Sequence, residues 1–239
     1  CLIAPDAKTI DWCRGRRGAP QGQAWDEAVA WWQTLRSDAD AVFDEEHHLD
    51  CTGLSPQLTW GTDPAQAMGI DEAVPQPLAL GASAQERASR ALAYMAVAAG
   101  QPLVGLPIDR VFIGSCSNAR LPDLRLAAQV VKGRRVAAGV QALVVPGSST
   151  IKRQAEAEGL DQVFLQAGFE WHEAGCSMCA GANGDIGSPG QRCVATSNRN
   201  FENRQGRDVR THLASPAMAA AAAVTGHLVD VRRLMETPA

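Results

Sequence analysis

Three cysteines in two short motifs carry the strongest chemical signal of this sequence. Cys116 lies in Gly-Ser-Cys-Ser-Asn (114–118), and Cys176 and Cys179 form the ends of Cys-Ser-Met-Cys. Iron–sulfur clusters that transfer electrons are held by four cysteines. Three thiolates would hold three corners of an iron–sulfur cube and leave the fourth iron open to a substrate. An open metal position acts as a Lewis acid, so the pattern indicates chemistry rather than electron storage.

The Cys-x-x-Cys pair taken alone has other interpretations. A zinc half-site, a redox-active dithiol and two buried thiols all give this spacing. Zinc would need Cys116 and one further ligand, for which the candidates are Cys193, His172, His47 and His48. A thioredoxin-like dithiol is disfavoured, because that pair begins a helix after the first strand of its fold and this one does not. Glycines beside both motifs would let backbone N–H groups approach cluster sulfurs.

A second group of polar residues is suited to binding an anion. Asn198, Arg199 and Arg204 lie in Asn-Arg-Asn-Phe-Glu-Asn-Arg (198–204). Guanidinium groups stay charged and bind carboxylates through paired hydrogen bonds. The segment therefore predicts a binding site for a di- or tricarboxylic acid. The alternative is a surface loop held by salt bridges.

These motifs need a scaffold, and the second half of the chain alternates predicted strands and helices. Apolar runs predict strands at 110–114, 141–145, 169–171 and 192–196. Caps, first-turn prolines and terminal glycines predict helices from Ser83 to about residue 100, from Pro122 to Gly133, from the Ser148-Ser149 turn to Gly159, and over 215–224. The alternation predicts an α/β fold, a parallel sheet with helices on both faces.

The predicted strands also place the motifs. Ligands of open parallel sheets bind at the carboxyl ends of the strands. Cys116, the Cys176–Cys179 pair and residues 197–200 each follow a predicted strand, so we expect them to meet at one edge of one sheet. Ser148 and Ser149 are expected to cap a helix, with anion binding as the alternative.

The first third of the chain gives weaker signals. Apolar residues at helical spacing predict a helix from Trp25 to about Leu35, and residues 41–43 predict a short strand. The proline-rich stretch 55–82 has little periodicity and is expected to be a connecting segment. The cysteines outside the two motifs are expected to be packing thiols: Cys1, Cys13, Cys51 and Cys193.

Composition limits the class of protein. The 239 residues are 46% hydrophobic and 20% charged, which suits a globular core. The formal charge of −4 argues against nucleic acid or an anionic membrane as a partner, and we see no apolar run long enough to span a membrane. Seven cysteines do not resemble a disulfide framework and favour a reducing, cytoplasmic compartment. Because the sequence starts at Cys1 and not Met, we expect the numbering to begin inside a longer product.

Several motifs together resemble the aconitase superfamily, and within it the large subunit of 3-isopropylmalate dehydratases. The resemblance extends from Leu2 to Ala220 and is carried by 114–120 (Gly-Ser-Cys-Ser-Asn-Ala-Arg), 142–148, 175–179, 196–201 and 210–213. It implies that Cys116, Cys176 and Cys179 ligate a [4Fe-4S] cluster whose open iron binds a 2-hydroxy diacid. It also implies that Arg199 and Arg204 contact the substrate carboxylate or neighbouring groups.

The resemblance further implies what this chain would contain. Residues 1–54 correspond to the end of a second aconitase-like domain, and 55–239 to a complete, cluster-bearing third domain. The N-terminal half of the large subunit and a small swivelling subunit, which carries the seryl base, would be separate partners. Two positions depart from the family pattern: the stretch 180–184 has smaller side chains, and Asn203 replaces a glycine. The alternatives are therefore a hydro-lyase for another 2-hydroxy diacid, and a non-catalytic iron- or redox-sensing module.

Overall fold

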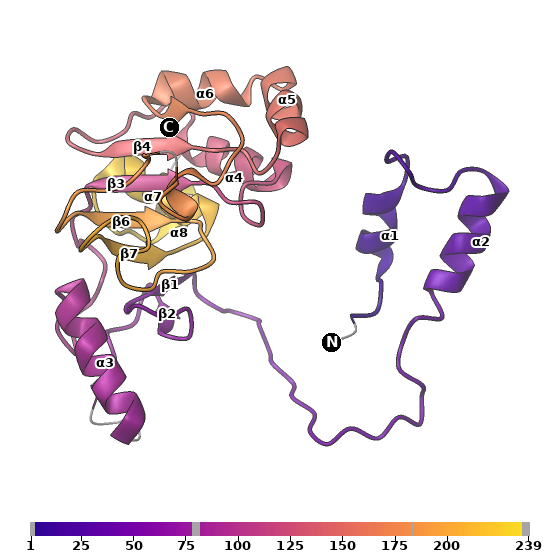
Figure 1. The fold of residues 1–239 in the computed structure, drawn as a ribbon, viewed down its shortest axis with the longest axis horizontal. Helices are drawn as coiled ribbons and strands as arrows, with labels where there is room; N and C mark the ends of the chain where they lie inside the picture. Colours follow the sequence, from indigo (N-terminus) through magenta and orange to yellow (C-terminus); the bar gives the residue numbers. More distant parts are fainter. Residues whose placement is uncertain (1–2, 78–81, 183, 236–239) are drawn as a thin grey trace. The chain divides into compact units, whose positions relative to one another are not determined.

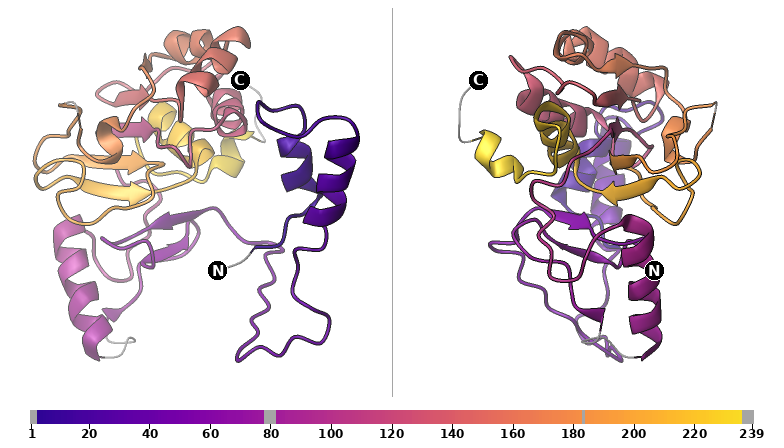
Figure 2. Two further views of the ribbon diagram at one scale, coloured as in Figure 1. Left: turned by 45° about the vertical axis from the view of Figure 1, so that its right-hand side comes forward. Right: turned by 90° about the vertical axis from the view of Figure 1, so that its left-hand side faces the viewer.

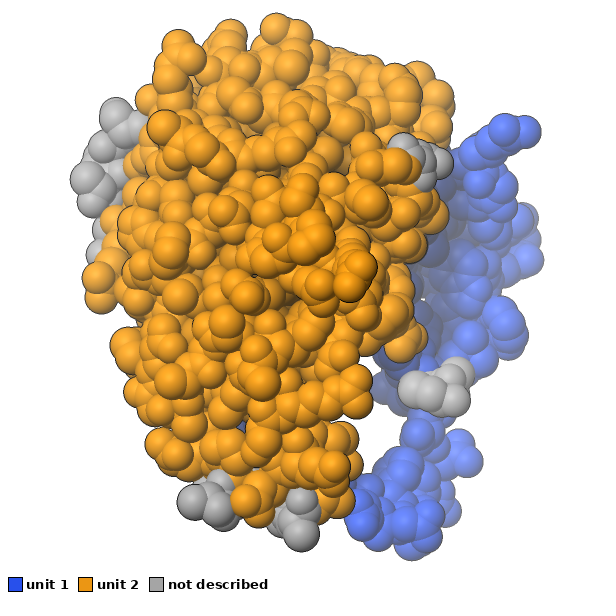
Figure 3. All heavy atoms as spheres, turned by 60° about the vertical axis from the view of Figure 1, so that its left-hand side comes forward, with its two compact units in different colours: residues 1–52 blue, residues 53–239 orange. Residues whose placement is uncertain are grey.

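The computed structural model describes residues 3–77, 82–182 and 184–235, and it divides into two compact units, residues 1–52 and 53–239 (Figure 3). The sequence-based expectation was a division at 54/55, between parts of two aconitase-like domains. That assignment of the units to particular domains stays a prediction. Each unit is described by itself below.

The first unit holds two helices, α1 (Ala7–Cys13) and α2 (Gln23–Trp32). Ile10 of α1 and Trp25 of α2 are both buried, and the rings of Trp25 and Trp32 pack edge-on with their centres 5.6 Å apart. The predicted helix at Trp25 is confirmed, although it ends three residues earlier than expected. The predicted strand at 41–43 is wrong, because these residues pair with no other strand in the described part of the unit, and Val42 is 96% exposed.

The second unit is built around a five-stranded parallel sheet of order β5-β4-β3-β6-β7 (Figure 1). The central strands are continuous apolar runs, as expected of strands covered on both faces. The strand bounds are β3 (Arg110–Ile113), β4 (Gln141–Val144), β5 (Glu170–Trp171), β6 (Arg192–Ala195) and β7 (Arg210–Leu213). The predicted α/β fold, a parallel sheet flanked by helices, is confirmed.

The two faces of this sheet are covered differently. On one face Val111 and Ile113 of β3 pack in a large core with α4 (Leu121–Val131) and α7 (Pro216–Thr225). The many alanines of α7 are buried, and their small size lets the helix approach β3 and α4 closely. On the other face, loop residues including Met178 cover a smaller core that contains Phe112.

An antiparallel hairpin and a helix lie beside this sheet in the same unit (Figures 1 and 2). The hairpin joins β1 (Gln57–Thr59) to β2 (Ala67–Gly69), and α3 (Ala82–Met95) follows it. The expectation of an irregular connecting segment over 55–82 is therefore wrong. Leu58 and Trp60 are buried and alternate with polar residues, which is the strand signal that the surrounding prolines obscured.

Two further helices begin directly after a serine that caps them. Ser148 begins α5 (Ser149–Ala157) by accepting the Ile151 N–H at 3.2 Å, which confirms its predicted capping role. Ser215 caps α7 in the same way, through the Met218 N–H at 3.2 Å. The helices α1, α6 (Leu160–Ala167) and α8 (Val231–Met235) were not predicted from the sequence. Within the described residues, we find no helix with the length and hydropathy needed to cross a membrane.

Candidate functional site

Loops that follow the carboxyl ends of β3, β4 and β6 are tied together by hydrogen bonds. Thr196 Oγ1 accepts the Gly114 N–H at 2.8 Å and donates to the Gly114 carbonyl at 2.7 Å. Asn118 Nδ2 donates to the Thr196 carbonyl at 2.7 Å, and the Gly147 N–H donates to the Ala119 carbonyl at 2.9 Å. These contacts make one continuous surface, which we call the carboxyl edge.

Cys116 lies on this edge, next to a strained residue. The thiol of Cys116 is exposed and free. Ser115 before it is buried and has φ of +89°, a left-handed conformation that costs a non-glycine residue about 1–3 kcal/mol. Its Oγ accepts the Asn118 N–H at 3.2 Å, which holds the turn. The surroundings therefore fix an unfavourable backbone beside an accessible thiol.

Cys176 directly precedes a short 3₁₀ turn after β5, η2 (Ser177–Cys179), and Cys179 is its last residue. Cys176 is exposed and Cys179 is half-buried. Met178 between them is fully buried against the sheet, so it anchors the turn. Ser177 also has a left-handed backbone, with φ of +43°, and its hydroxyl donates to Asp185 at 2.8 Å. Both cysteine motifs thus contain a left-handed serine next to a free thiol.

The three thiols suit an iron–sulfur cluster in type, because soft thiolates are its usual ligands. All three are free and at least partly accessible, on loops that follow parallel strands. In the part of the chain that the structure describes, however, no group of three or more His, Cys, Asp or Glu side chains could hold a metal ion. Joint ligation by Cys116, Cys176 and Cys179 therefore stays a prediction.

The other cysteines differ in their surroundings. Cys193 in β6 is fully buried, and burial raises the pKa of its thiol to about 12, so its predicted role as a packing thiol is confirmed. Cys13 is half-buried, whereas Cys51 is exposed, so the packing prediction for Cys51 is wrong. Cys1 lies outside the described residues.

The segment 198–204 presents the predicted anion-binding residues. Asn198 and Arg199 are exposed, and no side-chain hydrogen bond or ion pair engages Arg199 within the described residues. Arg204 is half-buried, with its guanidinium 5.1 Å from the centre of the Phe201 ring. Its Nε is buried without a hydrogen-bond partner in the described structure. Both guanidinium groups therefore retain hydrogen-bonding capacity for an anion.

Asn200 fixes this segment to the rest of the unit, a role that the sequence did not reveal. Its side chain is buried, and Nδ2 donates to the Gly61 carbonyl at 2.7 Å, the Thr59 hydroxyl at 3.1 Å and the Thr211 carbonyl at 3.2 Å. Gly61 and Thr59 belong to the hairpin that was expected to be irregular. The hairpin therefore helps to position the residues on either side of Asn200.

Residues of helix α3 also form hydrogen bonds with the segment 198–204. Arg90 donates two hydrogen bonds to the Glu202 carboxylate, both at 2.8 Å, and this pairing lowers the pKa of Glu202. The Tyr94 hydroxyl accepts the Asn203 N–H at 2.8 Å and donates to the Val209 carbonyl at 2.9 Å. Asn203 has φ of +67°, a conformation that favours glycine. These partners are more than a hundred residues apart in sequence, so no local pattern indicates them.

Two neighbouring strands of the sheet, β6 and β7, contribute a buried polar pair. Arg192 and His212 meet at 2.8 Å between Nη1 and Nε2, and His212 Nδ1 lies 2.7 Å from the Thr59 carbonyl. Burial, with Arg192 nearby, lowers the pKa of His212 to about 3, so the imidazole is neutral and donates Nδ1–H to Thr59. Burial likewise lowers the pKa of Arg192 to about 10. Because both side chains are buried, we assign the pair a structural role.

A pocket of about 330 Å³ opens at the carboxyl edge. Asn118 and Ser197 line it from the two loops that Thr196 joins, and Thr59 and Ser215 line it from β1 and the start of α7. This volume is in the range of small-molecule sites. The carboxyl edge therefore has a cavity. Two of its lining residues, Asn118 and Ser197, are close in the sequence to the free thiol of Cys116 and to the exposed Arg199.

These features define an α/β protein with free thiols and arginines on loops that follow the strands of its parallel sheet. The sequence matches the Aconitase family (aconitate hydratase) over residues 1–226. The chain therefore belongs to the aconitase family, which confirms the resemblance at that level. Membership supports hydro-lyase or isomerase chemistry, and members of the family usually bind an iron–sulfur cluster.

Proposed function

We propose that this chain is the cluster-binding part of a hydro-lyase that dehydrates and rehydrates a 2-hydroxy diacid, specifically 2-isopropylmalate to 3-isopropylmalate in leucine biosynthesis. One observation carries the proposal: in a chain of the aconitase family, both cysteine motifs have a left-handed serine beside a free thiol. Strained backbone of this kind persists at functional sites, because the surroundings hold it in place.

The proposed ligands of a [4Fe-4S] cluster are Cys116, Cys176 and Cys179. When bound, the cluster supplies a Lewis-acidic iron whose open position takes the substrate hydroxyl and a carboxylate. Arg199 and Arg204 bind and orient substrate carboxylates, since their guanidinium groups have free donors. Asn198 is proposed as a further donor to the substrate.

The reaction also needs a base for the substrate proton, and we propose that this base comes from a partner. The proposed partners are the N-terminal half of a large subunit and a small swivelling subunit. We propose a reducing, cytoplasmic compartment, because the described cysteines are free thiols.

Anaerobic reconstitution tests the ligand set. The chain is treated with iron and sulfide, and we expect about four irons and four acid-labile sulfides per chain. Cys116→Ser, Cys176→Ser and Cys179→Ser should each reduce the cluster content and its visible absorbance by at least about half, because each removes one of only three protein ligands. Cys51→Ser is the matched control, since Cys51 is an exposed thiol outside the motifs.

The cluster content of the variants decides whether the three cysteines are the ligands. Full cluster content in all three motif variants would contradict the ligand assignment, as would an equal loss in the Cys51→Ser control. Folding is checked by circular dichroism on each variant, so that a lost cluster is not confused with a lost fold.

One position bears on the choice of substrate. Asn203 has a left-handed backbone where the resemblance leads us to expect glycine. The complex assembled with both partners should be assayed with two diacids, 2-isopropylmalate and 2-methylmalate, and with the tricarboxylic acid citrate. The proposal expects the highest kcat/KM for 2-isopropylmalate. A higher value for another diacid would retain the hydro-lyase and replace its substrate.

A further inference from the structure

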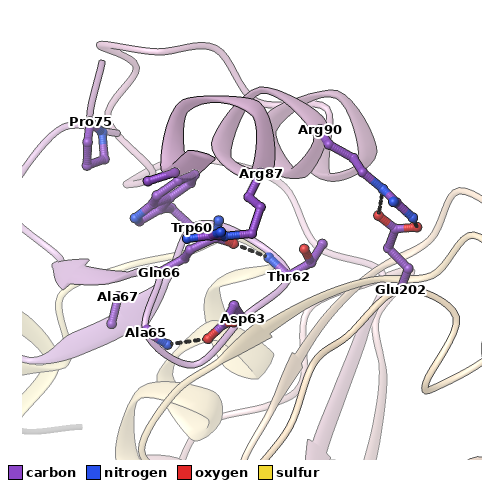
Figure 4. Close-up of a pocket in the computed structure, with 11 residues that line it drawn as sticks. Trp60, Thr62, Asp63, Ala65, Gln66, Ala67, Pro75, Arg87, Arg90 and Glu202 are labelled. Atoms are coloured by element: carbon purple, nitrogen blue, oxygen red, sulfur yellow. Dashed lines mark hydrogen bonds and ion pairs between the residues drawn. The ribbon is translucent and has the colours of Figure 1, made fainter. Parts of the chain in front are cut away.

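A second pocket, of about 480 Å³, lies within residues 53–239 (Figure 4). It is formed by α3, by the turn that joins β1 to β2, and by Glu202. Its lining residues include none of the motif cysteines and neither Arg199 nor Arg204. The volume suits a small organic molecule. The pocket is therefore separate from the proposed cluster site and needs its own explanation.

Some side chains that line this pocket carry donors without a partner within the described residues, whereas Arg90 is paired with Glu202. Trp60 is only 4% exposed, yet its indole N–H donates no hydrogen bond within the described residues. Arg87 projects from α3 toward Trp60 and Gln66, and no ion pair or hydrogen bond in the described structure engages its guanidinium (Figure 4). Gln66 accepts the Thr62 N–H through Oε1 at 2.8 Å, and its amide nitrogen has no partner there. The Trp60 indole nitrogen is not among the buried polar atoms that lack a partner, so it reaches open space and is available to an acceptor, as is the exposed Arg87 guanidinium.

The two carboxylates that line the pocket differ in their partners within the described residues. Both oxygens of Glu202 accept hydrogen bonds from Arg90, at 2.8 Å each. Asp63 accepts the Ala65 N–H through Oδ1 at 2.8 Å. The charge of Glu202 is neutralised by Arg90, whereas the charge of Arg87 has no such partner. The charge of Asp63 has no ion-pair partner in the described structure either. The Arg87 guanidinium and the Trp60 indole N–H are donors without a partner in this lining, and they suit a ligand that is rich in acceptors.

The rest of the wall is apolar. Ala67, Pro75 and Ala84 line the pocket together with the ring of Trp60. An inorganic anion would leave this surface in contact with water, whereas a short hydrocarbon group would cover it. The walls therefore favour an organic anion over phosphate or sulfate.

We propose that this pocket binds the carboxylate of a small organic acid. The Arg87 guanidinium and the Trp60 indole N–H donate to the carboxylate, and the hydrocarbon part lies against the alanine and proline side chains. The proposal does not depend on the cluster or on the reaction, because none of the cysteine or arginine residues assigned above takes part.

Isothermal titration of the purified chain tests this directly. Butanoate, hexanoate and 3-phenylpropanoate are the probes, each compared with its neutral amide and with inorganic phosphate. We expect saturable binding of at least one carboxylate, at least about tenfold tighter than that of its amide, because a hydrogen bond to a charged group is lost. Phosphate should bind more weakly than the best carboxylate.

Two variants and a control locate the binding. Arg87→Gln should weaken carboxylate binding about tenfold or more, and Trp60→Phe, which keeps an aromatic ring and removes the N–H, about threefold to tenfold. Arg153→Gln is the control, because Arg153 is an exposed arginine on α5 outside the pocket. Circular dichroism confirms the fold of each variant.

Three outcomes would overturn the proposal. They are the absence of saturable binding by all three acids, equal binding of an acid and its amide, and equal affinities of the Arg87→Gln and Arg153→Gln chains. If phosphate bound as tightly as the best carboxylate, the pocket would be an inorganic-anion site and the organic acid would be excluded as its preferred ligand.

Discussion

The interior of the sheet and its carboxyl edge differ in burial, although the same strands lead from one to the other. In β3, Phe112 and Ile113 are completely buried, whereas Cys116 three residues later is exposed. The interior is mostly apolar, and the buried polar side chains Arg192 and His212 are paired with each other. The edge has a left-handed serine, free thiols and an exposed, unpaired arginine.

The difference shows where stability and chemistry reside in this unit. Burial of the strands supplies the free energy that holds the edge in an unfavourable backbone. The edge contributes accessible groups rather than stability. A change in the interior should therefore act on folding, and a change at the edge should act mainly on reactivity.

Thiol alkylation gives the largest contrast between the two regions. We expect iodoacetamide to modify Cys116 and Cys176 in the native, iron-free chain at least about a thousandfold faster than Cys193. Cys193 reacts only after the core opens, which at ordinary stabilities is rarer than one molecule in a thousand. Burial also raises the pKa of Cys193 to about 12, so little thiolate is present.

Mass spectrometry of the labelled peptides against time measures the three rates. The same chain in urea is the control, because all the thiols are then exposed and should react at similar rates. Equal rates for Cys193 and Cys116 in the native chain would mean that the interior opens as readily as the edge.

Acidification probes the interior and should have a smaller effect. The pKa of His212 is about 3 in the folded chain and about 6.5 when unfolded, so between these values only the unfolded chain binds the proton. The stability contribution is therefore complete above pH 6.5 and is lost as the pH falls. We expect a loss of about 2 kcal/mol in unfolding free energy between pH 7.5 and pH 5.0.

Urea unfolding at the two pH values measures this loss. His212→Gln is the matched variant, because the amide can still accept from Arg192 and donate to the Thr59 carbonyl but does not titrate in this range. The variant should have lower stability at pH 7.5 and a much smaller pH dependence. An unchanged pH dependence in the variant would assign the effect to other groups.

The parts of the fold that the sequence predicted are those with local signals. The apolar runs of β3, β4 and β6 placed these strands within about a residue, and Ser215-Pro216 placed the start of α7. Strand β7 carried no such signal, because Arg210 and His212 are polar. Their partners Tyr94, Gly190, Arg192 and Thr59 become visible only once the chain is folded.

The same limit applies to the candidate site. Residue type and motif spacing indicated the cysteines and arginines, and the structure places their segments after parallel strands. The contacts of Asn200 with the hairpin and of Arg90 with Glu202 join residues far apart in sequence. The sequence does not show whether an asparagine is buried or exposed, so these long-range contacts could not be predicted from it.

Substitution of Ser115 tests the strain at the edge itself and should give the smallest effect. Ser115→Ala removes the hydroxyl that accepts the Asn118 N–H and keeps the left-handed backbone, so we expect a loss of about 1 kcal/mol. Ser115→Gly removes the same hydroxyl but relieves the strain at φ of +89°, so its stability should stay within about 0.5 kcal/mol of the parent. Urea midpoints of the two variants give the comparison. If glycine were no more stable than alanine, the backbone at Ser115 would carry no strain, and the edge would differ from the interior in exposure alone.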